Sequence, residues 1–114
     1  MSQHAGLTVE RWRSFSHPQR ILMIANEMNR ASRLVDQAHA NSRQLCYERV
    51  LRLVDLTIAA APRSSVRREM LRWRDLAAEL YLADRHEPDF HRAAVRALLQ
   101  QTPESAGQIR HLGC

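Results

Sequence analysis

The sequence predicts an all-α fold, an antiparallel up-and-down bundle of four helices in one domain. The chain has 114 residues, 45% of them hydrophobic, which suits one compact core. Aromatic residues are only 5%, and three glycines and four prolines are too few for the turns of a many-stranded sandwich or barrel. Apolar residues instead recur at helical spacing in four segments.

The first segment is predicted to be a helix over about residues 17–39. Ser16 and Gln19 have the spacing of a capping box, and Pro18 is tolerated in a first turn. Residues 1–16 lack a period and are predicted to form an N-terminal arm, anchored by Trp12 and Phe15. The apolar face of the helix is Ile21, Ile24, Ala25, Met28, Ala31, Val35 and Ala38.

A second helix is predicted over about residues 42–60. Asn41 and Gln44 repeat the capping-box spacing, and so short a connection predicts an antiparallel hairpin of the first two helices. One broad face holds the apolar residues, namely Cys46, Tyr47, Val50, Leu51, Leu53, Val54, Thr57 and Ile58.

Two further helices are predicted after Pro62. The third is capped by Ser64 or Ser65 and ends near Asp84, and its face is Val66, Met70, Trp73, Ala77, Leu80 and Tyr81. The fourth starts at Pro88 and is closed by Pro103, with a face of Phe90, Ala93, Ala94, Ala97 and Leu98. The bundle domain is therefore predicted over residues 17–102, followed by a flexible tail over 103–114.

Three of these helices also carry apolar residues away from the main face. The first has Met23 and Leu34 there, beside Glu27. Single exposed leucines are normal on any protein surface, whereas a second apolar stripe also suits a twofold dimer. The self-association interface is predicted at Leu45, Arg49, Arg52, Leu56, Leu71 and Leu82, with Asp75 and Ala78 on the same stripe.

All 17 basic residues are arginine, and the net charge is +5. The absence of lysine has two interpretations: codon bias in a GC-rich genome, or a need for bidentate contacts to phosphates or carboxylates. The candidates for nucleic-acid contact are Arg63, Arg67, Arg68 and Arg72, near Arg74. Glu69, Asp75 and Glu79 lie among them and partly neutralise this face.

Several acidic and basic residues have the spacing of helical ion pairs. Glu27 with Arg30, and Arg52 with both Glu48 and Asp55, fit this spacing, and Tyr47 is adjacent. Solvated pairs of this kind contribute a few tenths of a kcal/mol each. The alternative is a partly buried Glu/Arg network between the first two helices.

Enzyme and metal motifs are missing from the sequence. It contains neither Glu-x-x-His nor His-x-x-x-His, and the glycines form no phosphate loop. Asp36 and His39 come nearest to a ligand pair, at a helix end where the dipole also favours histidine. Cys46 is predicted in the core and Cys114 exposed. We therefore expect no metal and no cofactor.

The predicted first hairpin consists of the stretch from Ile21 to Ala31, a tight polar turn and the stretch from Cys46 to Ile58. This hairpin resembles the start of HEPN domains, which are small four-helix bundles. The resemblance covers about residues 17–60. In that family an arginine, a polar residue, a short spacer and a histidine can carry metal-independent RNA cleavage across a dimer interface. The resemblance thus makes Arg85 and His91 the catalytic candidates.

This segment departs from the HEPN pattern at two positions. Pro88 interrupts the spacer, and Ala93 stands where a tyrosine is common. The other interpretation of Arg85 and His91 is a surface pair near a turn. Family members without the motif act as binding or partner subunits, which the looser resemblance implies.

These observations predict a non-catalytic, homodimeric protein-interaction module. The alternative is a HEPN-like RNA- or nucleotide-binding protein, a metal-independent ribonuclease or a toxin–antitoxin partner. No stretch reaches the roughly 20 apolar residues of a membrane span, and no secretory signal is visible, so a cytoplasmic location is expected.

Overall fold

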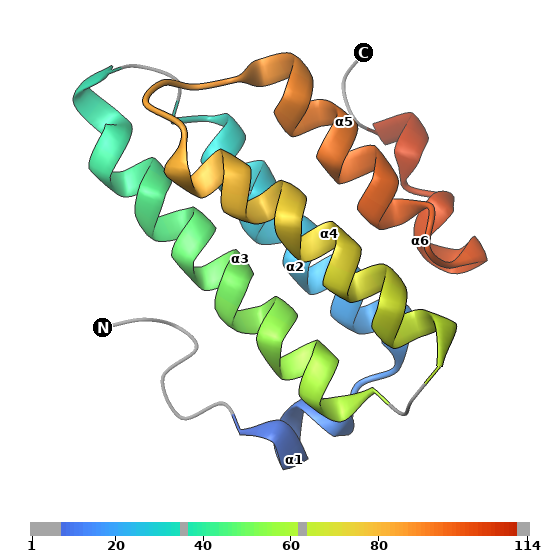
Figure 1. The fold of residues 1–114 in the computed structure, drawn as a ribbon. Helices are drawn as coiled ribbons and strands as arrows, with labels where there is room; N and C mark the ends of the chain where they lie inside the picture. Colours follow the sequence, from blue (N-terminus) through green and yellow to red (C-terminus); the bar gives the residue numbers. More distant parts are fainter. Residues whose placement is uncertain (1–7, 35–36, 62–63, 112–114) are drawn as a thin grey trace.

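The computed structural model describes residues 8–34, 37–61 and 64–111, which form helices and connections without a strand. The predicted all-α class is confirmed. Four longer helices, α2 (His17–Ser32), α3 (Ala40–Ala60), α4 (Ser65–Leu82) and α5 (Pro88–Leu99), lie side by side (Figure 1). The shorter elements are α1 (Val9–Arg13), α6 (Pro103–Ala106) and 3-10 turns at Gln37–His39 and Ile109–His111. None of the described helices is long and apolar enough to cross a membrane.

The longer helices form a closed arrangement, in which α2 and α4 each pack against both α3 and α5. The predicted faces of α2, α3 and α4 form most of the core. Its α2 residues are Ile21, Ile24, Ala25, Met28 and Ala31; its α3 residues are Cys46, Tyr47, Val50, Leu53 and Val54; its α4 residues are Met70, Trp73, Ala77 and Leu80.

The segment predicted as an arm contains the helix α1, which packs against α3. Trp12 is fully buried, and its indole N–H donates to Oγ1 of Thr57 at 2.8 Å. Phe15 meets the Trp12 ring edge-on, with ring centroids 5.7 Å apart. Trp12 is therefore confirmed as an anchor. A helix of five residues is too short to show an apolar period, which is why the sequence does not reveal it.

The start of α2 is confirmed but its predicted end is wrong. Ser16 and Gln19 form the capping box, whereas the helix ends at Ser32 instead of near residue 39. The N–H groups of Arg33 and Leu34 bond to carbonyls three residues back, which tightens the last turn. Arg43 donates to the Leu34 carbonyl at 2.6 Å, taking the acceptor that a longer helix would use. Val35, expected on the apolar face, lies outside the described residues.

The second predicted capping box is also wrong. α3 begins at Ala40 with His39 as its N-cap, so Asn41 and Gln44 lie within the helix. The Gln44 side chain instead donates to the carbonyl of Tyr81 at 3.4 Å and links α3 to α4.

The buried face of α5 differs from the predicted one by about one residue. Its inward residues are His91, Ala94, Val95, Leu98 and Leu99. Ala93 and Ala97 are exposed. The spacing of apolar residues does not reveal this face because a histidine, His91, occupies its first turn.

Residues 103–111, which the sequence predicts as part of a flexible tail, contain α6 and the 3-10 turn at Ile109–His111. Thr102 caps α6 by accepting from the N–H of Ser105. Ser105 is fully buried and its hydroxyl donates to the Leu99 carbonyl at 2.7 Å. Ile109 packs against the core. This segment is held by capping bonds, which composition does not reveal; residues 112–114, including Cys114, lie outside the described part.

Candidate functional site

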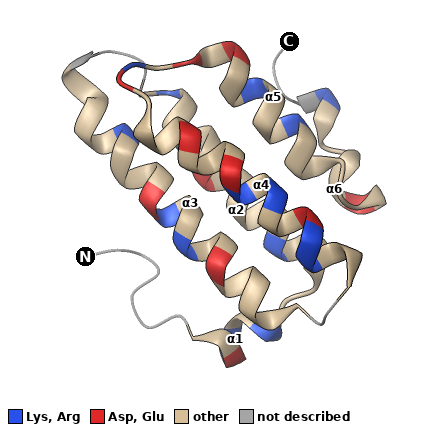
Figure 2. Ribbon diagram, in the orientation of Figure 1, with Lys and Arg blue, Asp and Glu red and all other residues tan. Residues whose placement is uncertain are grey.

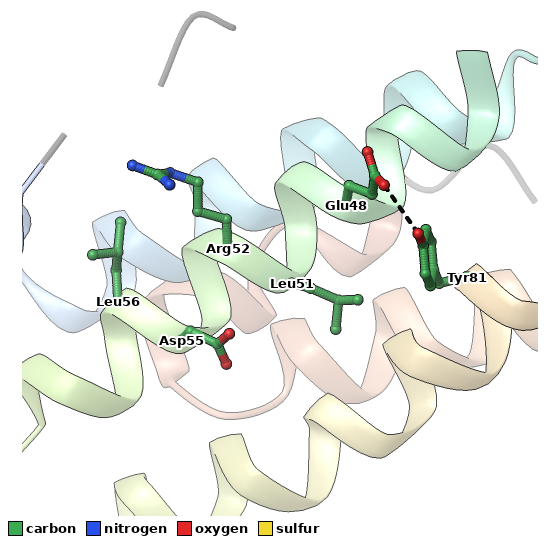
Figure 3. A pocket seen from close by; sticks show the side chains of 6 residues that line it. All are labelled: Glu48, Leu51, Arg52, Asp55, Leu56 and Tyr81. Atoms are coloured by element: carbon green, nitrogen blue, oxygen red, sulfur yellow. Dashed lines mark hydrogen bonds between the residues drawn. The ribbon is translucent and has the colours of Figure 1, made fainter. Parts of the chain in front are cut away.

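The outer face of α3 carries a shallow groove of about 540 Å³. Figure 3 shows Arg52 and Leu56 pointing outward at one end and Glu48 meeting Tyr81 at the other. The residues that line this α3 groove are Glu48, Leu51, Arg52, Asp55 and Leu56 of α3 with Tyr81 of α4. Arg52 and Leu56, which are predicted interface residues, are therefore both in it.

Two polar contacts join α3 to α4 beside the groove. The Tyr81 hydroxyl donates to Glu48 at 2.9 Å, and this bond raises the pKa of Tyr81. Nε of Arg74 donates to Asp55 at 2.7 Å. The predicted pairing of these carboxylates with Arg52 is therefore wrong. Arg52 is exposed and makes no ion pair among the described residues.

The leucines of the predicted interface divide into two groups. Leu45, Leu71 and Leu82 are 52%, 47% and 74% exposed, the large hydrophobic residues exposed in the described part of the chain. Leu56 is half-buried and packs against the core. On a helical wheel, Leu45, Arg52 and Leu56 share one outward side of α3, and Leu71 and Leu82 share one side of α4.

Arg49, also predicted at the interface, points inward. Its Nε donates to Glu27 at 3.2 Å, and Arg30 donates to the same carboxylate at 3.0 Å. Glu27 is only 1% exposed and both arginines are partly exposed, so the partly buried Glu/Arg network between the first two helices is confirmed. Burial lowers the pKa of Arg49, but the bond and charge of Glu27 outweigh burial and raise it. Burial also raises the pKa of the adjacent Cys46 thiol, which lies in the core as predicted.

A second polar cluster joins α3 to α5. The hydroxyl of Tyr47 and Nδ1 of His91 share a hydrogen bond of 2.7 Å, and both side chains are buried. Burial raises the pKa of Tyr47 to about 12. Burial and the neighbouring His86 lower the pKa of His91 to about 4, while the Met28 carbonyl acts in the opposite direction. Both groups are therefore neutral near pH 7.

His91 also lines a hollow of about 340 Å³ between the end of α2 and the start of α5, which we call the α2–α5 pocket. Nε2 of His91 and Nδ1 of His86 are buried and make no direct hydrogen bond to a described residue, although the Met28 carbonyl acts on the His91 ring. The lining residues are Asn29, Ser32, His86, Pro88, His91, Arg92 and Val95.

The two candidate catalytic residues are not brought together. The Arg85 side chain is 84% exposed and lies 3.7 Å from Glu87. His91 is 4% exposed, so the prediction that it forms a surface pair with Arg85 is wrong. Pro88 begins α5, which places His91 one turn later on the inward face. The sequence does not predict the pairing of His91 with Tyr47, because the two residues are 44 positions apart and lie on different helices.

The described arginines proposed to contact nucleic acid lie on α4 and line two different hollows. Arg67 and Arg68 line a hollow with Ser64 and Leu71. Arg72 lines another hollow, beside Glu69. Arg63 lies outside the described residues. Figure 2 shows acidic and basic positions interspersed along α3 and α4, so no uniformly basic stripe runs along these helices.

Within residues 8–34, 37–61 and 64–111, no three histidine, cysteine or acidic side chains gather as a metal site requires. Asp36, considered with His39 as a ligand pair, is not among these residues. Comparisons with protein-family models, curated proteins and solved structures find no match to this chain. The resemblance to HEPN domains stays a prediction.

Proposed function

We propose that this protein is a non-catalytic interaction module that forms a homodimer through the outer face of α3. In this proposal α2, α3, α4 and α5 act as an antiparallel up-and-down bundle that holds the face rigid. The observation that carries the proposal is the exposure of Leu45, Leu71 and Leu82 on two neighbouring helices. Large apolar side chains exposed on neighbouring helices are typical of a protein–protein interface.

The sequence of α3 is suited to pairing with a second copy of itself. Leu45 and Leu56 lie at nearly equal distances on either side of Val50, and so do Glu48 and Arg52. Two copies of α3 crossing antiparallel at the level of Val50 would therefore set Leu45 of one copy opposite Leu56 of the other. The same crossing sets Arg52 opposite Glu48, so that apolar and charged residues both match under twofold symmetry.

The energetic roles of these contacts differ. Burying one half-exposed leucine contributes on the order of 1 kcal/mol, and twofold symmetry uses each leucine twice. The exposed Arg52 and Glu48 pair adds little affinity because solvent screens it, but it favours the antiparallel register over a parallel one. A stable interface buries about 800 Å² on each partner, so the leucines of α4 are needed as well as the groove.

Light scattering on a dilution series tests this proposal. The wild-type chain is expected at about twice its mass of 13.2 kDa, and Leu45→Glu is expected to shift it to the monomer. Ala93→Glu, at an exposed position of α5, is the matched control and should leave the dimer intact. A wild-type protein that stays at 13.2 kDa at high concentration would rule the proposal out.

A further inference from the structure

Arg52 in the α3 groove has two carboxylates of its own helix at the spacing of an ion pair. Glu48 lies four positions before Arg52, and Asp55 lies three positions after it. A glutamate four positions before a cation is the favourable order for a helical pair. Neither pair forms among the described residues, and Arg52 is exposed. Helical spacing alone does not explain why Arg52 stays unpaired.

The reason is that α4 holds both carboxylates. The Tyr81 hydroxyl donates to Oε1 of Glu48 at 2.9 Å. Arg74 donates to both oxygens of Asp55, from Nε at 2.7 Å and from Nη2 at 3.5 Å. Figure 3 shows Glu48 directed toward Tyr81 and Arg52 directed outward, away from both. The contacts that join α4 to α3 thus also leave Arg52 without a carboxylate in the described part of its own chain.

The two carboxylates differ in what they can still accept. Both oxygens of Asp55 are bonded to Arg74. Glu48 is exposed, and its Oε2 makes no hydrogen bond to the described residues. A free carboxylate oxygen accepts a charge-assisted bond from a guanidinium group. Glu48 is therefore the carboxylate of the groove that is available to a second chain.

We infer that Tyr81 and Arg74 set the partner specificity of the α3 groove by reserving Arg52 for Glu48 of a second copy. This inference rests on the proposed homodimer, in which the antiparallel crossing places these two residues opposite each other. Tyr81 and Arg74 are positioning residues. A pair between Glu48 and Arg52 within one chain would have to break before the pair between chains forms, and α4 removes that competition. A partner without a carboxylate opposite Arg52 leaves this cation unpaired and is disfavoured.

The first test measures the dissociation constant of the dimer by sedimentation equilibrium. Tyr81→Phe keeps the ring but frees Glu48 to pair with Arg52 in its own helix, so the constant should rise roughly twofold to fivefold. In an Arg52→Gln background the same change should have no further effect, because no cation remains to compete for. Gln44→Ala removes another contact between α3 and α4 without freeing a carboxylate, and should leave the constant unchanged.

A second measurement reports on Arg52 without depending on the dimer. Hydrogen exchange of its Nε–H with water is followed by NMR in the Leu45→Glu protein, which the proposed interface makes monomeric. Tyr81→Phe and Arg74→Gln each release a carboxylate for Arg52 and should slow this exchange severalfold.

The outcomes separate this inference from the homodimer. Unchanged exchange in both variants, or equal weakening of the dimer by Tyr81→Phe with and without Arg52, would overturn the positioning role. Slower exchange in a chain that is monomeric as wild type would support the positioning role and refute the homodimer.

Discussion

Arg49 of α3 donates to Glu27 of α2 at 3.2 Å, although its helical position places it on the outward stripe. A long side chain can reach back across a helix to a buried carboxylate, and this one does so because Glu27 is 1% exposed and needs cations near it. The pair fixes the register of α2 against α3. It also leaves Arg52 as the basic residue that α3 presents in its groove.

We expect the loss of this contact to be costly. Arg49→Ala leaves the Glu27 carboxylate buried with one cation fewer, and should lower the free energy of unfolding by about 2–4 kcal/mol. Glu27→Gln with Arg49→Met removes both charges and should cost less than the single Arg49→Ala change. Urea unfolding of the wild type and these two variants checks this, and a cost below about 0.5 kcal/mol for Arg49→Ala would show that the pair does not stabilise the fold.

The buried His91 should make the protein less stable in mild acid. Its pKa is about 4 in the folded chain against an ordinary 6.5, so between these values the unfolded chain binds a proton that the folded chain does not. Stability should therefore fall as the pH drops from 6.5 towards 4, by up to about 3 kcal/mol from this residue. His17 and His86 act in the same direction, because burial lowers the pKa of each.

Unfolding curves at several pH values compare the wild type with His91→Asn, whose side chain retains a partner for the Tyr47 hydroxyl. The variant should lose much of the dependence on pH between 6.5 and 4. Identical pH profiles for the two proteins would show that His91 is not the group responsible.

Trp12 should be needed for stability rather than for binding. Trp12→Ala removes a fully buried ring and its bond to Thr57, and should cost about 3–5 kcal/mol. Phe15→Ala should cost less because Phe15 is only partly buried. Calorimetric unfolding measures both. An equal or greater loss in the Phe15 variant would contradict the anchoring role assigned to Trp12.

Nucleic-acid binding should be weak. Arg67, Arg68 and Arg72 lie along α4 with Glu69 and Asp75 among them, so acidic residues partly neutralise their charge and they form no uniformly basic stripe (Figure 2). Any affinity for single-stranded RNA should fall steeply with salt, and the double variant Arg67→Gln, Arg68→Gln should reduce that slope. Micromolar or tighter binding at physiological salt would favour the RNA-binding alternative over the proposed module.

RNA cleavage is not expected from the observed placement of Arg85 and His91. Arg85 is exposed beside Glu87, whereas His91 is buried and bonded to Tyr47, so the two do not converge on one phosphate within a chain. Single-stranded RNA should stay intact with purified protein and a chelator. Cleavage lost in both Arg85→Ala and His91→Ala, with the fold unchanged, would contradict this expectation.

The parts of the fold that follow a long apolar period could be predicted from the sequence, and the parts held by single contacts could not. The cores of α2, α3 and α4 follow the helical period, so Ile24, Val50 and Ala77 are buried as expected. The helix α6 depends on a local capping bond from Thr102 to Ser105. A single capping bond of this kind produces no repeating pattern of apolar residues in the sequence.

The same distinction applies to the candidate sites. The exposure of Leu45 and Leu82 follows from their wheel positions, because it depends only on the direction in which each side chain points. The pairing of Tyr47 with His91 depends on how two distant helices pack. One signal was available: His91 precedes Ala94, Val95 and Leu98 at helical spacing, which marks it as an inward-facing residue.

Disulfide trapping tests the antiparallel pairing of two α3 helices most directly. Residues 45 and 56 of one chain are about 16 Å apart along the helix, too far for a disulfide within the chain. In a background with Cys114→Ser, Leu45→Cys and Leu56→Cys proteins are made separately, mixed and mildly oxidised. We predict a covalent dimer containing one chain of each variant, and little from either variant alone. Failure of the mixture to cross-link more than the separate variants would contradict the proposed dimer.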